Sequence, residues 1–176
     1  MEPKIYVILY REDDPRKNTA VKMIQRGLAK PISKKGVKGV PIVLNPYSHA
    51  YCGAWLRDYV LKNGIIVIDA SWKKLSCEKF IGIRGVHVKL PPLLPGNPIN
   101  YGKPCMLSSL EAVCAALYIT GFLEQYSKLL GLYKWMDTFH ELNKALLEEY
   151  ARASSDYELR EKIREYWGCD DPCYKT

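Results

Sequence analysis

The chain has 176 residues and a mass of 20.2 kDa, with 48% hydrophobic and 26% charged residues. This is ordinary globular composition, and the length suffices for one well-packed core, so we expect a single compact unit over residues 1–176. The longest apolar run, residues 112–119, is far shorter than the roughly 20 residues of a membrane-spanning helix. The N-terminus has no basic segment or cleavage site typical of a signal peptide. These features exclude a membrane span and favour a cytoplasmic protein.

The excess of basic over acidic residues, 26 against 19, lies in the first part of the chain. Residues 1–40 carry ten basic and four acidic side chains, residues 41–104 carry eight and three, and residues 105–176 carry eight and twelve. Such a polycationic segment favours a polyanionic partner, and nucleic acid fits better than lipid because no lipidation motif is present. A solvated basic surface without a ligand is the alternative that composition leaves open.

The first 104 residues have the patterning of an α/β fold. Short runs of β-forming apolar residues predict strands at residues 5–10, 40–44, 65–69 and 86–90. The segments between them predict helices at 20–28 and 50–62, a lysine- and glycine-rich loop at 30–39, and a helix or turn at 71–80. Alternating strands and helices are typical of a mostly parallel sheet, so we expect residues 1–104 to form a basic α/β part.

The second part begins with an irregular loop and is otherwise helical. Residues 91–104 contain five prolines and two glycines, which excludes regular structure, and long irregular loops in compact domains are often functional. Ser108 and Glu111 form a capping-box pattern that opens a helix ending near residue 121. Apolar residues at three- and four-residue spacing predict further helices over 132–150 and 155–167. Residues 105–176 therefore form a helical part that completes the core.

Asp69 is the clearest candidate functional residue, because it ends a fully apolar strand. Ligands of open parallel sheets bind at the carboxyl ends of the strands. A helix cap or a salt-bridged carboxylate is the purely structural alternative for this side chain. The six cysteines are expected to be mostly reduced; Cys169 and Cys173 are a weak metal signal but leave a tail disulfide possible. The sequence has no GxGxxG, Walker, HExxH or GxSxG motif.

Four segments resemble one protein family. They are DPRKNT at 14–19, IVIDASW at 66–72, LLPGNPINYGKP at 93–104 and LSSLEA at 107–112. In this order they are similar to the small-subunit ribosomal RNA aminocarboxypropyltransferases, ribosome-biogenesis proteins that act on a uridine-derived base, and the compact chain looks like an archaeal member. Asn18 and Ala70 stand where the family has cysteine. Because the N-terminal cysteine is absent, we predict no metal.

The resemblance implies a SPOUT-like fold with a trefoil knot, formed by the strand end at Asp69, the loop at 91–104 and the helix start at Ser108. It also implies S-adenosylmethionine as donor, with Asp69 either removing the proton from N3 of the base or fixing the donor. Trp72 would enclose the methyl group, and Thr19 and Ala112 would lie near the amino-acid end. The remaining donor-binding residues would be Leu44, Ile68, Leu93, Leu94, Asn97, Tyr101 and Ser108.

The implied partner is small-subunit rRNA or a pre-ribosomal subunit, with the target base presented in a single-stranded loop. The phosphate-binding face would comprise Arg11, Lys17, Lys22, Arg26, Lys30, Lys34, Lys35, Lys38, Lys73 and Lys74. Two alternatives stay open: a SPOUT-type RNA methyltransferase, and a non-catalytic rRNA-binding assembly factor. A monomer is favoured over a dimer, and no membrane partner is expected.

Overall fold

The computed structural model describes residues 1–10 and 14–173 and contains a five-stranded sheet whose strands are all parallel. The strands are β1 (Ile5–Leu9), β2 (Lys30–Pro31), β3 (Ile42–Leu44), β4 (Ile65–Asp69) and β5 (Val86–Val88), and they lie in the order β2-β1-β4-β3-β5. The central strand β4 is buried along its whole length. A parallel strand covered on both faces requires such a continuous apolar run, which explains why the sequence predicts it well.

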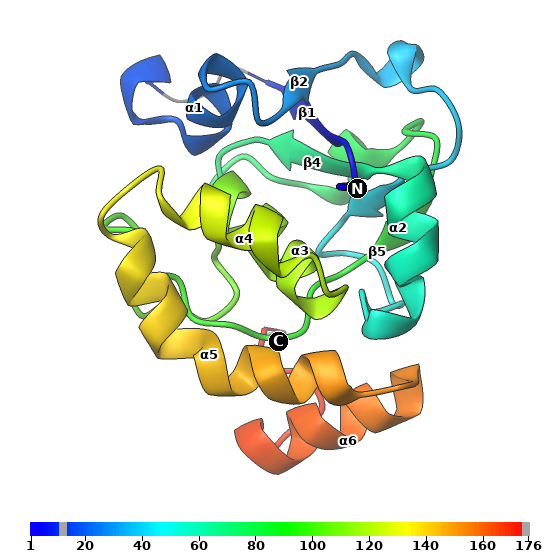
Figure 1. The fold of residues 1–176 in the computed structure, drawn as a ribbon, viewed down its shortest axis with the longest axis vertical. Helices are drawn as coiled ribbons and strands as arrows, with labels where there is room; N and C mark the ends of the chain where they lie inside the picture. The colour runs from blue at the N-terminus through cyan, green and yellow to red at the C-terminus, as the bar shows by residue number, and fades with distance from the viewer. Residues whose placement is uncertain (11–13, 174–176) are drawn as a thin grey trace.

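Within the described residues, six α-helices follow or cover the strands (Figure 1). They are α1 (Thr19–Gln25), α2 (Arg57–Asn63), α3 (Ser109–Ile119), α4 (Leu123–Leu130), α5 (Met136–Arg152) and α6 (Asp156–Trp167). In the view of Figure 1, α3 and α4 lie between the sheet and α5, and α6 packs beyond α5. Short 3-10 helices complete the fold at η1 (Pro15–Lys17), η2 (Lys34–Gly36), η3 (Ala54–Leu56) and η4 (Cys77–Phe80).

The sheet separates a large core from a small one. On the helical face, side chains such as Val7, Ile65 and Val67 pack with the apolar faces of α1 to α6. On the other face the smaller cluster comprises Ile8, Val37, Val43, Ile66, Ile68, Phe80 and Ile83, which come from the strands and from the turns around η2 and η4. Alternate residues of β1, β3 and β4 therefore pack into different cores, and burial of both sets fixes the register of these strands.

The structure corrects two predicted elements. Residues 50–53 are not helical, and residues 54–56 form only the 3-10 helix η3: Tyr51 forms a bridge with Lys89, Gly53 is extended, and α2 begins only at Arg57. Pairing with the chain that leaves β5 thus overrides the local helical pattern. The expected loop at 30–39 contains β2, whose Pro31 is tolerated because β2 is an edge strand and Pro lacks an N–H for the ladder.

The remaining predicted elements are confirmed with shifted ends. The helix expected at 20–28 spans Thr19–Gln25, and the segment 71–80 is a turn followed by η4. Gly64 ends α2 with φ +86°, and a Cβ there would lie 2.8 Å from the carbonyl oxygen of Lys4. Only glycine allows this close approach, which brings the start of β4 beside β1. None of the helices in the described part of the chain is long and apolar enough to cross a membrane.

Candidate active site

Asp69 joins the starts of two helices at the carboxyl end of β4. Its side chain is buried, with 7% exposure. Oδ2 accepts a hydrogen bond from Nδ2 of Asn18 at 2.6 Å, and Oδ1 accepts one from Oγ of Ser109 at 3.4 Å. Asn18 is the N-cap of α1, and Ser109 is the first residue of α3. The carboxylate therefore lies where three segments, distant in sequence, meet.

A second contact ties α1 to α3. The N–H of Leu110 donates to Oγ1 of Thr19 at 3.2 Å, so the first turns of the two helices lie against each other. Ala20 and Met23 of α1 are fully buried in the large core, which holds this short helix in place. Oriented N–H groups and helix N-termini favour an anionic group nearby, such as a carboxylate.

Glu111 fixes the loop that precedes α3. It is fully buried, and its carboxylate accepts from the backbone N–H of Gly96 and from Nδ2 of Asn97, both at 2.7 Å. It also accepts from the N–H and the hydroxyl of Ser108, at 3.0 and 2.9 Å, while Oγ of Ser108 accepts from the N–H of Glu111. The predicted capping box is confirmed, and the same carboxylate anchors the irregular loop over the helix start.

Trp72, in the segment that follows β4, borders the site. Its indole Nε1–H donates to the carbonyl of Leu107 at 3.0 Å, one residue before the cap of α3. The ring is half-buried, so one part of it remains accessible beside the start of α3. Lys73 and Lys74, which come next, are exposed. A half-buried aromatic side chain and two exposed lysines thus lie next to the segment that carries Asp69.

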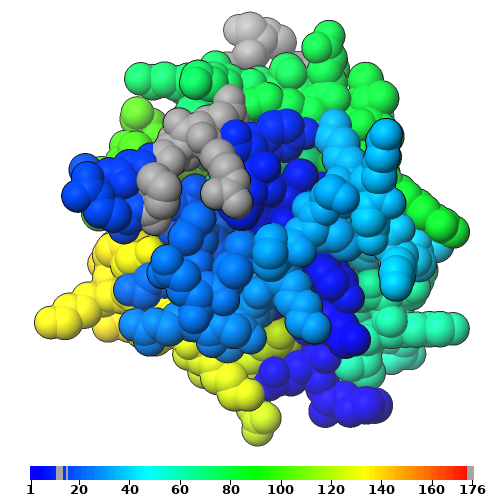
Figure 2. Space-filling view, turned by 90° about the horizontal axis from the view of Figure 1, so that it is seen from above, coloured from blue at the N-terminus to red at the C-terminus, as the bar shows by residue number. Residues whose placement is uncertain are grey.

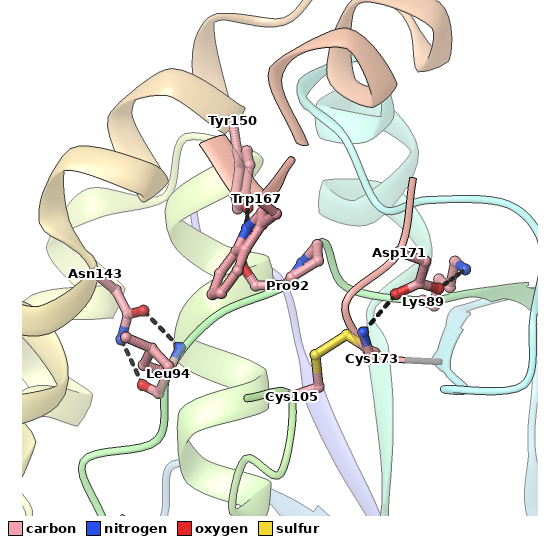
Figure 3. Close-up of a disulfide and its surroundings, with 9 residues drawn as sticks. All are labelled: Lys89, Pro92, Leu94, Cys105, Asn143, Tyr150, Trp167, Asp171 and Cys173. Carbon is pink, nitrogen blue, oxygen red and sulfur yellow. Dashed lines mark hydrogen bonds and ion pairs between the residues drawn. A yellow bond between two sulfur atoms is a disulfide. The ribbon is translucent and has the colours of Figure 1, made fainter. Parts of the chain in front are cut away.

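Helix α5 holds the other end of the loop (Figure 3). The side-chain amide of Asn143 accepts from the N–H of Leu94 at 2.8 Å and donates to its carbonyl at 2.7 Å. Tyr150 donates to the carbonyl of Pro92 at 2.8 Å, and Gly96 lies so close to α5 that a Cβ would be 2.5 Å from a backbone nitrogen of that helix. The loop is irregular in conformation, but its first part, residues 92–97, is held by buried partners.

The C-terminal tail fastens this loop as well. A disulfide joins Cys105, directly after the proline-rich loop, to Cys173 (Figure 3). Asp171 forms an ion pair of 2.9 Å with Lys89, which follows β5. The tail disulfide considered between Cys169 and Cys173 is therefore not formed, because Cys173 pairs across the fold and Cys169 is free and exposed. Cys105 and Cys173 come together only through the packing of α5 and α6.

Several of the predicted donor-binding residues lie on the segments that meet at Asp69, and others lie on the neighbouring strand and loop. Ile68 precedes Asp69, Leu44 ends the neighbouring strand β3, Ser108 caps α3, and Ala112 lies in its first turn. Leu93 is fully buried, and its carbonyl accepts from the N–H of Cys105.

Tyr101 is the exception among the predicted donor-binding residues. Its side chain is 60% exposed, and within residues 1–10 and 14–173 no hydrogen bond or ion pair joins it to Asp69. Sequence reasoning missed the roles of Asn18, Ser109 and Asn143. Their partners lie 51, 40 and 49 residues away in the chain, so only the N-cap position of Asn18 left a local signal.

Residues 1–10 and 14–40 form much of one face of the molecule, coloured blue to light blue in Figure 2. Of the predicted phosphate-binding side chains in this part of the chain, Lys17, Arg26, Lys30, Lys35 and Lys38 are exposed. Lys22 and Lys34 are half-buried: Lys22 lies over the ring of Tyr133, and Lys34 donates to the carbonyl of Ile81. Arg11 falls outside the described residues.

No metal centre is evident within residues 1–10 and 14–173: no three His, Cys, Asp or Glu side chains are grouped to hold an ion.

The architecture is that of an α/β ligand-binding protein, with a buried acid at the carboxyl end of a central parallel strand and a cationic face. A family model described as "Ribosome biogenesis protein, C-terminal" matches residues 42–167.

The chain belongs to the family of 16S rRNA aminocarboxypropyltransferases. A relative of that name from Sulfurisphaera tokodaii is 44% identical over 162 residues, covering 92% of this chain and 94% of the relative. Another from Methanothermobacter thermautotrophicus is 39% identical over 169 residues, covering 94% and 99%. The structure of the SAM-dependent rRNA:acp-transferase Tsr3 from Vulcanisaeta distributa is similar with a TM-score of 0.82 and 34% identity, covering 96% of this chain and all of that one.

Proposed function

We propose that this protein transfers the 3-amino-3-carboxypropyl group of S-adenosylmethionine to N3 of a uridine-type base in small-subunit rRNA. One observation supports the position of the reaction: a buried carboxylate, Asp69, lies at the end of β4 against the starts of both α1 and α3. The names of the relatives given above describe this class of reaction. The residues at the junction suit both a cationic donor and a nucleophilic base.

The residues present fit the donor. A sulfonium is favoured beside the carboxylate of Asp69, and an amino-acid carboxylate is favoured beside the N-terminus of the eleven-residue helix α3. Thr19 and Ala112, at the first turns of α1 and α3, would border the amino-acid end, and the half-buried ring of Trp72 would cover the methyl group. Backbone groups of Leu44, Ile68, Leu93 and Ser108 would hold the nucleoside, together with Leu94 and Asn97.

The chemistry is a displacement at carbon. When bound, S-adenosylmethionine supplies a methylene carbon activated by the adjacent sulfonium; the N3–C bond forms as the C–S bond breaks and methylthioadenosine leaves. N3 of a uracil-type base is protonated at neutral pH, so a group must accept that proton, and Asp69 is our candidate. Trp72 determines which carbon of the donor reacts: because its ring covers the methyl group, the methylene carbon is left to face the base.

For the RNA, we propose that backbone phosphates are bound by the predicted basic side chains that are exposed, which are Lys17, Arg26, Lys30, Lys35, Lys38, Lys73 and Lys74. Such contacts position the strand without reading its sequence. Affinity should therefore fall steeply with salt. We further propose a SPOUT-like trefoil knot through the strand end at Asp69, the loop at 91–104 and the start of α3. We also propose a monomer acting in the cytoplasm, with no metal.

The test uses S-adenosylmethionine that carries one isotope in the methyl group and another in the methionine carboxylate. The purified protein is incubated with small-subunit rRNA, and the label in the RNA is counted. Carboxylate label without methyl label supports the proposal. Methyl label alone would replace it with methylation, and no label from either position would leave only an rRNA-binding role.

Asp69→Asn then separates the two roles of the acid. If Asp69 accepts the proton, kcat should fall by about 10²- to 10⁴-fold while the donor binds with unchanged affinity. If Asp69 fixes the donor, the dissociation constant for S-adenosylmethionine should rise instead. Asp156→Asn, a half-buried acid at the start of α6 that pairs with Arg160, is the matched control and should change neither quantity.

A further inference from the structure

We infer that Asn18 is a positioning residue for the transfer reaction, because its side-chain amide orients the carboxylate of Asp69. The inference rests on the proposed function and on the role of Asp69 as proton acceptor. Asn18 is 5% exposed, and its Nδ2 lies 2.6 Å from Oδ2 of Asp69. A hydrogen bond from a buried amide to a carboxylate is charge-assisted and among the stronger kinds in proteins.

The orientation of the Asn18 amide is determined by its other contact. As N-cap of α1, Asn18 accepts a hydrogen bond from the N–H of Val21 through Oδ1 at 3.0 Å. The amide has one oxygen and one NH2 group, so the oxygen turned toward the helix leaves the NH2 group turned toward Asp69. One side chain therefore both caps the helix and donates to the acid.

The support behind Asn18 is rigid. The residues after it, Ala20 and Met23, are fully buried in the large core, and Oγ1 of Thr19 accepts from the N–H of Leu110 in α3. The cap cannot shift without disturbing these contacts. The position of α1 therefore fixes, through Asn18, one carboxylate oxygen of Asp69. Ser109 of α3 contacts the other oxygen. A catalytic acid or base needs a side chain held in place by such surrounding contacts.

Substitution can separate the capping role of Asn18 from its contact with Asp69. In Asn18→Ser, the hydroxyl retains the capping acceptor but is one bond too short to donate to Asp69 as the amide does. In Asn18→Asp, the cap and the shape are retained, but the donor is replaced by a second carboxylate. Because Asn, Asp and Ser are comparable N-caps, neither change should unfold α1.

The experiment compares kcat, KM for S-adenosylmethionine and for rRNA, and melting temperature in the full-length protein. We expect Asn18→Ser to lower kcat about tenfold or more, the rate equivalent of losing one hydrogen bond to a charged group. Both KM values should stay within about twofold of the wild-type values. Ser155→Ala, which removes the cap of α6 far from Asp69, is the control for helix capping and should lower melting temperature without changing kcat.

The double variant N18D/D69N adds a readout that a merely structural role would not affect. It restores a donor and an acceptor at the same two positions but moves the carboxylate to residue 18. We expect it to recover the melting temperature lost in N18D while kcat stays at least a hundredfold below wild type, since general-base catalysis is worth about 10²- to 10⁴-fold.

Three results would overturn the inference: wild-type kcat in Asn18→Ser, an increase in KM for S-adenosylmethionine with unchanged kcat, or activity restored by the double variant. Failure of the proposed function is distinguishable from all of these, because the wild-type protein itself would then transfer no carboxylate label.

Discussion

The disulfide between Cys105 and Cys173 should make a large contribution to stability, and Cys173→Ser removes it. The bond closes a loop of 68 residues that contains α3, α4, α5 and α6. In the reduced or substituted protein, the tail and the proline-rich loop keep the Lys89–Asp171 ion pair but lose their covalent link. The unfolded chain then samples many more conformations, which lowers the free energy of unfolding.

The loop length determines the expected size of the effect. For a separation of 68 residues, loop-closure entropy predicts a loss of about 4 kcal/mol at 25 °C. A protein of this length changes its melting temperature by about 2–4 °C per kcal/mol, so we expect a decrease of about 8–16 °C. This is a large fraction of the roughly 5–15 kcal/mol by which domains are stable.

The assay is thermal unfolding followed by circular dichroism, with and without a reducing agent, together with a count of free thiols in denaturant. Cys173→Ser and Cys105→Ser should melt at the same reduced temperature, and reductant should lower only the wild type and Cys169→Ser. Cys169→Ser is the matched control because that thiol is exposed and free. A destabilised Cys169→Ser beside an unchanged Cys105→Ser would refute the pairing, and equal melting of all four proteins would refute the magnitude.

Three further predictions concern buried groups. Glu111→Gln should lower the free energy of unfolding by about 3 kcal/mol in urea titrations, because an amide cannot accept all the bonds that the carboxylate receives from Gly96, Asn97 and Ser108; an unchanged midpoint would contradict this. Asn143→Leu should cost about 2–4 kcal/mol, since the N–H and carbonyl of Leu94 lose their partner, and hydrogen exchange at the Leu94 amide should accelerate. Burial raises the pKa of the Cys52 thiol from 9.0 to about 12, so the unfolded chain loses this proton first as pH rises. The stability of wild type relative to Cys52→Ala should therefore be constant below pH 9 and fall by about 1.4 kcal/mol per pH unit from 9 to 12, and parallel pH curves for the two proteins would exclude it.

The sequence predicts the central elements well because they depend on local patterning. The apolar run at residues 65–69 can only be a strand buried on both faces, and Asp69 at its end marks the edge of the sheet where ligands bind. The capping box at Ser108 and Glu111 likewise defines the start of α3 without any distant partner. In such cases the spacing of residue types is enough to predict the element and where it begins or ends.

The prediction of residues 50–56 as part of an α-helix fails for the opposite reason. Tyr51 pairs with Lys89, and the energy of that pairing is not visible in the local pattern. The strand at Lys30–Pro31 is missed in the same way, because its two residues are strand-like only through their hydrogen bonds to β1. Tertiary context overrides weak local preference at both places.

By itself the sequence determined the α/β class, the parallel strands, the candidate acid and, through its motifs, the resemblance to its family. Only the tertiary structure decided what touches Asp69: Asn18 and Ser109 lie 51 and 40 residues away along the chain. It also decided that Cys173 pairs with Cys105 rather than with its near neighbour Cys169. Local patterns record which groups prefer burial or a helix end, whereas contacts between distant residues depend on how the whole chain packs.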